Sequence, residues 1–161
     1  MKQHSLLLLT GLLAMGFVSN LGAQEVKELP TVTVTATTNV SEKVADVFSK
    51  EFTEALNPRW YKLNKNYLVT FIEKDMDNKA LFKKNGYMVY HIAYGKENNL
   101  PDDVRKLIKS NYVDFDITNT FNVHQDKRNI WIANLEDAKK LVIVRIEEGA
   151  IEEVGNYDKT E

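Results

Sequence analysis

Two histidines are the most versatile side chains for chemistry in this sequence beyond its N-terminal segment. His91 and His124 lack the His-x-x-x-His or His-Glu-x-x-His spacing of a zinc site. His91 lies between Tyr90 and Ile92, which favours a partly buried, hydrogen-bonded histidine over a catalytic one. His124 adjoins a polar turn, where we expect a solvated side chain. We therefore predict no metal site and no cofactor.

Serine and carboxylate groups also lack the spacing that catalysis requires. No serine stands in a Gly-x-Ser-x-Gly elbow. The acid pairs are adjacent in sequence, so on a strand their side chains point to opposite faces; they are Asp102-Asp103, Glu147-Glu148 and Glu152-Glu153. The segment 75–78 is rich in carboxylates but lacks the glycine and closing glutamate of an EF-hand. We predict a protein that is not an enzyme, with an unrecognised active site as the alternative.

The N-terminus has the layout of a secretory signal peptide over residues 1–23. Lys2 precedes an apolar run from Leu6 to Val18, and small or polar residues lead to a cleavage point after Ala23. The run of about 13 residues is shorter than the roughly 20 that cross a bilayer. We predict a periplasmic or secreted protein without a permanent membrane anchor. A short buried N-terminal helix is the alternative.

The composition of the exported chain limits the classes of partner that it can bind. The sequence has 21 basic and 23 acidic residues, and removal of Lys2 with the signal changes the net charge from −2 to −3. This balance predicts no nucleic-acid binding. The absence of cysteine excludes disulfides and thiol-linked lipids. About 138 residues remain after cleavage, which is enough for one domain.

The exported chain divides into a short leading segment and one domain. Residues 24–40 alternate threonine with valine near their centre, which indicates an extended segment or a flexible tether. The domain at 41–161 contains two helix patterns. The first begins at Ser41 and stops at Asn57-Pro58, and the second begins at Pro101. Their apolar positions correspond at a constant shift of sixty: Val44, Val47, Phe48 and Phe52 match Val104, Leu107, Ile108 and Tyr112.

Strand patterns follow each helix, separated by turn residues. In the first half they cover 60–61, 67–72, 79–83 and 87–94, and in the second half 116–123, 129–135, 141–146 and 150–154. Asn85-Gly86 predicts a two-residue hairpin. We interpret the domain as a tandem αβββ repeat, at 41–95 and 96–161, because Asn66-Tyr67-Leu68-Val69 aligns with Asn129-Ile130-Trp131-Ile132. The predicted fold class is α+β, with one antiparallel sheet and both helices on one face; chance similarity of the halves is the alternative.

The order of aromatic positions in these elements carries a family resemblance. A helix ending in an aromatic precedes a Trp-led strand, a Tyr-x-Val-x-Phe strand, an Ala-x-Phe strand and an Asn-Gly turn. The residues are Phe48, Phe52, Trp60, Tyr67, Val69, Phe71, Ala80, Phe82, Asn85 and Gly86. This arrangement resembles the PepSY-like secreted proteins, whose fold is similar to that of the beta-lactamase-inhibitor protein. It covers about residues 41 to 155, although the second half lacks the Trp and the Phe pair. The resemblance implies a non-enzymatic domain that binds or restrains other proteins.

The predicted strands are apolar on both sides. Two helices cannot cover both faces of the sheet that these strands form. If Tyr67, Val69 and Phe71 face the helices, the intervening residues face away. One of the two alternating sets of residues in 87–94 faces away as well. In the second half, Trp131, Ala133 and Leu135 join this outward side, near Ile143. We predict an exposed aromatic face with five candidate binding residues: Leu68, Ile72, Tyr90, Tyr94 and Trp131. The alternative is that the segment around Val32 and Val34 covers this face.

These observations predict an exported binding module, inhibitor-like in character, that contacts an unidentified protein in the periplasm or outside the cell. A small-ligand or lipid carrier that uses the same face is the alternative function. A homodimer that packs the two faces together is a further alternative.

Overall fold

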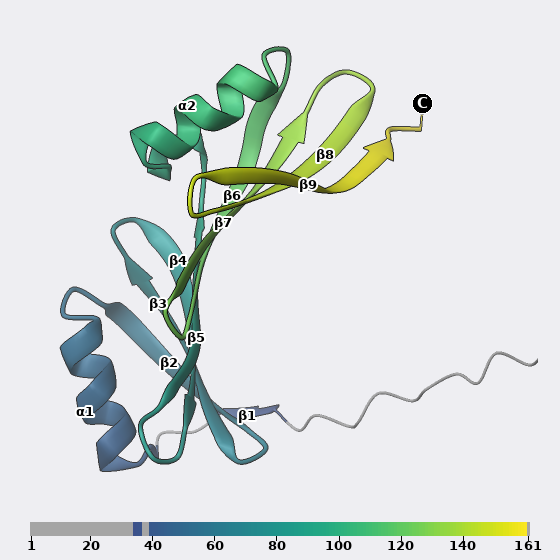
Figure 1. The fold of residues 1–161 in the computed structure, drawn as a ribbon. Helices are drawn as coiled ribbons and strands as arrows, with labels where there is room; N and C mark the ends of the chain where they lie inside the picture. Colours follow the sequence, from purple (N-terminus) through teal and green to yellow (C-terminus); the bar gives the residue numbers. More distant parts are fainter. Residues whose placement is uncertain (1–33, 37–38, 161) are drawn as a thin grey trace, which may run out of the picture. The chain divides into compact units, whose positions relative to one another are not determined.

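Nine antiparallel strands form one sheet in which every strand pairs with its neighbours in sequence (Figure 1). The computed structural model describes residues 34–36 and 39–160. The strands are β1 (Val34–Ala36), β2 (Leu56–Leu63), β3 (Asn66–Glu73), β4 (Met76–Lys83), β5 (Met88–Gly95), β6 (Asp116–Gln125), β7 (Arg128–Glu136), β8 (Lys140–Glu147) and β9 (Ala150–Asp158). Together with the helices they confirm the α+β class and the single antiparallel sheet.

Two ten-residue helices pack on the sheet, one on each half. They are α1 (Glu42–Glu51) and α2 (Asp102–Asn111), and a 3₁₀ helix, η1 (Glu97–Asn99), precedes α2. Four strands follow each helix, so the αβββ description is one strand short. The segment around Trp60 is a full eight-residue strand, because it pairs with β1 on one side and β3 on the other. The duplication itself stays a prediction.

The first helix ends earlier than the sequence suggests. α1 stops at Glu51, and Phe52 adopts a non-helical backbone (φ −122°, ψ 70°) while its N–H still donates to the Phe48 carbonyl at 2.9 Å. This turn buries the Phe52 ring, which is 7% exposed. Pro58 therefore lies inside β2, at a bulge between Leu56 and Arg59, where a strand tolerates a residue without an N–H.

Both helices pack on the same face of the sheet. α1 contributes Val44 and Phe48, and the residue after it Phe52, to a core with β3 and β4. α2 contributes Val104 and Ile108 to a core with β7 and β8. Residues directly opposite each other in a ladder share a face. One such row runs from Phe71 through Asn78, Ala93, Asn122 and Trp131 to Ile146, and so joins the first core to the second. We call this side the covered face and the other side the free face.

Hairpin turns differ from the prediction at two places. The carboxylate-rich segment 75–78 is typical of a hairpin turn, but only residue 75 lies in one, and residues 76–78 begin β4. Four connections are two-residue turns, at 64–65, 74–75, 126–127 and 148–149. The predicted turn at Asn85-Gly86 is instead part of a four-residue loop, in which the Lys83 N–H donates to the Tyr87 carbonyl at 2.9 Å. Gly86 has a φ of 87°, and a Cβ there would lie 3.2 Å from the Lys43 carbonyl oxygen and from Val47 Cγ2. The loop therefore packs directly on α1.

A polar cluster separates the two apolar cores on the covered face. His91 Nε2 lies 2.9 Å from Asn78 Oδ1, and the Asn78 amide donates to the Met76 carbonyl at 2.7 Å. The Asn78 oxygen is thus the acceptor, and His91 Nε2 carries the proton. The ring of His91 stacks on that of His124, with centroids 5.7 Å apart. Burial, and then the charge of His124, lower the pKa of His91 to about 4.

The two histidine predictions have different outcomes. His91 is partly buried and hydrogen-bonded, as predicted. His124 is also half-buried, and burial lowers its pKa, so the expectation of a solvated side chain is wrong. Its position opposite His91 in the β5–β6 ladder places it inside the polar cluster rather than at the turn. Among the described residues, no group of three or more His, Cys, Asp or Glu side chains is arranged to hold a metal ion.

Gly86→Ala should destabilise the domain by roughly 2–3 kcal/mol, because it combines an unfavourable positive φ with crowding against α1. Urea denaturation measures this change. Gly149→Ala is the matched control, since Gly149 has a φ of 78° but no heavy atom within 4 Å of the added Cβ. Equal losses for the two variants would contradict the packing of the loop on α1.

The free energy of unfolding should fall as the pH decreases from about 6.5 to about 4. The unfolded chain protonates His91 near its ordinary pKa of 6.5, whereas the folded chain takes the proton only near 4. We expect a loss on the order of 1 kcal/mol, because His91 is only partly buried. Urea denaturation at several pH values tests this, and His91→Gln should flatten the profile. An unchanged slope in that variant would exclude His91 as the cause.

A candidate binding surface on the free sheet face

The free face carries a continuous set of apolar side chains from β2 to β8. No helix or strand among residues 34–36 and 39–160 packs against it. The ladder pairings assign to it Tyr61, Leu68, Leu81, Tyr90, Ile92, Phe121, Val123, Ile130, Ile132 and Ile143. Leu81 and Ile130 are buried by their neighbours, and the other eight are half-buried. β1 extends the edge of the sheet, with Val34 opposite Leu63, and does not lie across this face.

Four of the five predicted binding residues lie on the free face. Leu68 and Tyr90 flank Leu81 in one row, and Ile72 and Tyr94 flank Asp77 in another. The Tyr94 ring also meets Phe121 edge-on, with centroids 5.5 Å apart. Burial is the main cause that raises the pKa of Tyr90. The set that faces outward in β5 is therefore Tyr90, Ile92 and Tyr94.

The predicted placement of Trp131 is wrong. Trp131 pairs with Asn122 and Ile146 on the covered face and packs against the core beneath α2. Ala133 and Leu135, which were also expected to face outward, are completely buried in that core. The cause is the alignment of Tyr67 with Ile130, since Tyr67 lies on the covered face and Ile130 on the free face. A shift of one residue exchanges the two faces of a strand.

Several residues of the free face were not predicted. Leu81 stands between Ala80 and Phe82, so its neighbours in sequence gave no alternation to follow. Met88 turns to the covered face because the β4–β5 register shifts between Leu81 and Phe82. Ile130 and Ile132 could have been found only by placing Trp131 in the core, since they alternate with it along β7.

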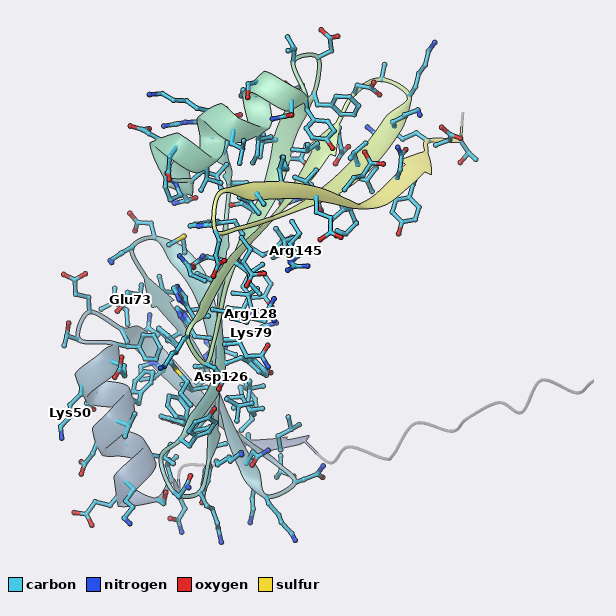
Figure 2. The ribbon with its side chains drawn as sticks, viewed as in Figure 1. Lys50, Glu73, Lys79, Asp126, Arg128 and Arg145 are labelled. Atoms are coloured by element: carbon cyan, nitrogen blue, oxygen red, sulfur yellow. The ribbon has the colours of Figure 1, made fainter. Side chains whose placement is uncertain are left out.

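Charged residues border the apolar rows at the β7–β9 side of the free face. Arg128 donates two hydrogen bonds to Glu147, at 2.6 and 2.8 Å, and Arg145 bridges Glu147 and Glu152. The hydrogen bonds from Arg128 and Arg145 lower the pKa of Glu147 to about 2. Figure 2 shows Lys79, Arg128 and Arg145 on the side of the sheet away from Lys50 of α1. The surface thus has an apolar centre and a charged rim, which is the anatomy of protein interfaces.

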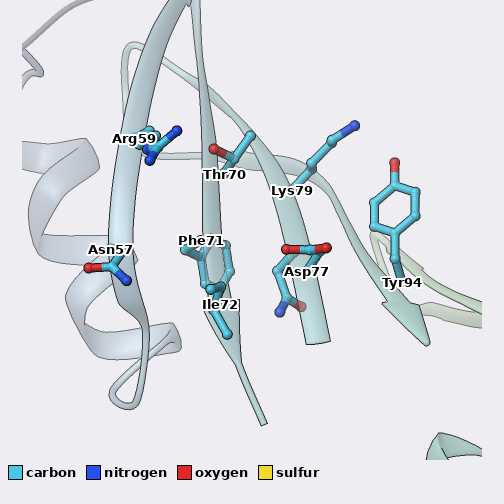
Figure 3. A pocket seen from close by; sticks show the side chains of 9 residues that line it. Asn57, Arg59, Thr70, Phe71, Ile72, Asp77, Lys79 and Tyr94 are labelled. Atoms are coloured by element: carbon cyan, nitrogen blue, oxygen red, sulfur yellow. The ribbon is translucent and has the colours of Figure 1, made fainter. Parts of the chain in front are cut away.

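A pocket of about 440 Å³ opens on the free face beside the β2 bulge (Figure 3). Arg59, Thr70 and Lys79 form one side of it, and Ile72, Asp77 and Tyr94 the next row. Asn57 also lines it, and so do Phe71 and Asn78, whose side chains the ladder pairings place on the covered face. The Lys79 ammonium lies 4.9 Å from the centre of the Tyr94 ring, within cation–π distance. The sequence predicts Ile72 and Tyr94 on this face, but it gives no sign that Arg59, Thr70 and Lys79 lie beside one another.

Solved structures from Bacteroides share this arrangement of helices and strands. A BLIP-like protein from Bacteroides fragilis has a TM-score of 0.59 at 17% identity, over 78% of this chain and 90% of its own. A DUF2874 family protein from Bacteroides uniformis has a TM-score of 0.57 at 15% identity, over 74% and 90%. A candidate periplasmic protein from Bacteroides eggerthii has a TM-score of 0.55 at 13% identity, over 74% and 89%.

These likenesses establish the fold, which is BLIP-like, at identities too low to carry function. No family model matches the sequence, and no curated protein matches it. The PepSY-like resemblance therefore stays a prediction. Within the described residues, none of the helices is long and apolar enough to span a membrane. The predicted signal peptide at 1–23 lies outside the described residues, as does most of 24–40 before β1.

Trp131→Ala should lower the free energy of unfolding by roughly 2–3 kcal/mol, since it leaves a cavity beside the α2 core. Ile72→Ala is the control on the free face, where the side chain is 38% exposed, and we expect a loss below about 1 kcal/mol. Thermal or urea denaturation of both variants measures the difference. A small effect of Trp131→Ala would place this ring outside the core.

Proposed function

We propose that this chain is an exported, non-enzymatic module that binds another protein through the free face of its sheet. The observation that carries the proposal is the apolar free face itself, which no described helix covers. Monomeric proteins rarely expose contiguous apolar area of this kind without using it for contact. Leu68, Ile72, Tyr90 and Tyr94 are the proposed contact residues. Tyrosines suit this role because they give large contact area at low conformational cost.

The proposed place of action is the periplasm or the exterior. The signal-like N-terminus supports it, and so does the likeness to the Bacteroides eggerthii structure. We further propose that the chain is related to the PepSY-like secreted proteins, which would make its activity inhibitor-like. The BLIP-like neighbour supports a binding role over catalysis. Trp131 is no longer among the proposed contacts, because it packs in the core.

Site-specific photo-crosslinking in the exported fraction tests the proposed surface. A photoreactive residue at Leu68, Tyr90 or Ile92 should produce crosslinked species of one common mass. The same residue at Lys50 or Lys106, which are exposed on the helices, should not. The species identified by mass spectrometry is then purified, and Tyr90→Ala should weaken its binding by about 2 kcal/mol, as expected for an aromatic contact residue.

Each other result points to a different function. Crosslinks only between copies of this chain would replace the proposal by the homodimer. A co-purified small molecule in the native mass spectrum, lost in Tyr90→Ala, would replace it by the carrier. Crosslinks from Lys50 and Lys106 alone would move the contact surface to the helices.

A further inference from the structure

We propose that the pocket beside the β2 bulge receives an acidic side chain from the partner, carried on a loop next to an apolar residue. The proposal rests on the proposed function, since it assigns the chemistry of what the free face binds. It is carried by a row of three polar residues on neighbouring strands, by the lack of ion-pair partners for its two cations among the described residues, and by the apolar residues beside them.

Arg59, Thr70 and Lys79 lie directly opposite one another on β2, β3 and β4. Neighbouring strands are about 4.8 Å apart, so the backbones of the two cationic residues are roughly 10 Å apart with the threonine between them. Figure 3 shows their side chains beside one another on the same side of the strands. A guanidinium, a hydroxyl and an ammonium can all donate hydrogen bonds to one carboxylate placed above Thr70.

The charges of this row are unneutralised within the part of the chain that the structure describes. Neither Arg59 nor Lys79 forms an ion pair with another described residue. Asp77 lines the pocket too, but in the neighbouring row and outside salt-bridge distance of both cations. At the opposite rim, Arg128 and Arg145 are already paired with Glu147 and Glu152. An incoming carboxylate therefore gains more at Arg59 and Lys79 than at these two paired arginines.

The apolar residues of the pocket define what must accompany the acid. Ile72 and Tyr94 lie one row away, and the Tyr94 ring holds the Lys79 ammonium at 4.9 Å. From there the face continues through Ile92 and Phe121. A free carboxylate or phosphate ion would meet the cations but leave these side chains in water. A protein loop with an acidic and an apolar residue satisfies both, and exclusion of water strengthens the charge pairing.

Selection of disulfide-closed random loops on the immobilised chain, expressed from its complete sequence, tests the proposal. Enriched loops should contain Asp or Glu beside an aliphatic or aromatic residue. Replacing that acid by Asn or Gln in the synthesised loop should weaken binding to the wild-type chain about tenfold, as for a close charge pair. On the Arg59→Gln/Lys79→Gln variant the same replacement should have almost no effect. Lys50→Gln/Lys106→Gln, which removes two exposed lysines from the helices, is the matched control and should behave as the wild type.

The outcomes separate this inference from the proposed function. In one outcome the loops bind Tyr90→Ala/Ile92→Ala more weakly, but replacing their acid by Asn or Gln has the same effect on the wild-type chain and on Arg59→Gln/Lys79→Gln. That result overturns the acidic-side-chain assignment and leaves the binding face intact. Loops that ignore both pairs of substitutions, or the absence of any enriched loop, overturn both. Sodium acetate and sodium phosphate are titrated alone by calorimetry. Binding of either as tightly as the loop would assign the pocket to a small anion and overturn the protein loop.

Discussion

Successive side chains of a β-strand point to opposite faces of the sheet, and in this protein apolar residues occupy both sets of positions while both helices lie on one side. Ten-residue helices are only about 15 Å long, so each covers the strands of its own half. The remaining apolar rows have no cover within the described chain. The proposed binding surface exists because of this unequal covering.

The covered face is itself divided. Rings from α1, β2 and β3 build the first core, where Phe48 meets both Trp60 and Phe71 edge-on at 5.2 Å, and aliphatic residues build the second. Between them lie Asn78, His91 and His124, joined by a hydrogen bond and ring stacking. Asn122 is buried beside them and donates a hydrogen bond to the Asn129 side chain at 2.7 Å. Buried polar groups that are hydrogen-bonded cost little stability, but a proton added to His91 meets no acidic partner among the described residues. The joint between the halves is therefore sensitive to acid, as is the Glu147 ion-pair network, whose carboxyl pKa is also lowered.

The free face is also uneven, because its two ends treat charge differently. Arginines near β8 are neutralised by glutamates of β8 and β9, whereas Arg59 and Lys79 near β2 and β4 face an open pocket. The bulge in β2, caused by Asn57 in a left-handed conformation followed by Pro58, places this pocket next to the aromatic rows. A partner that recognises both charge and apolar area would be oriented by this difference.

The sequence by itself determined the two helices, the antiparallel meander, the α+β class and the excess of apolar residues on two strand faces, because these depend on local periodicity and turn residues. It also placed Leu68, Ile72, Tyr90 and Tyr94 together on one side of the sheet. Only the tertiary structure decided the position of Trp131, since the facing of β7 depends on its register with β6 and on packing against α2. The row of Arg59, Thr70 and Lys79 likewise exists only through strand pairing. Side chains ten or more positions apart become neighbours by register, which no local pattern records.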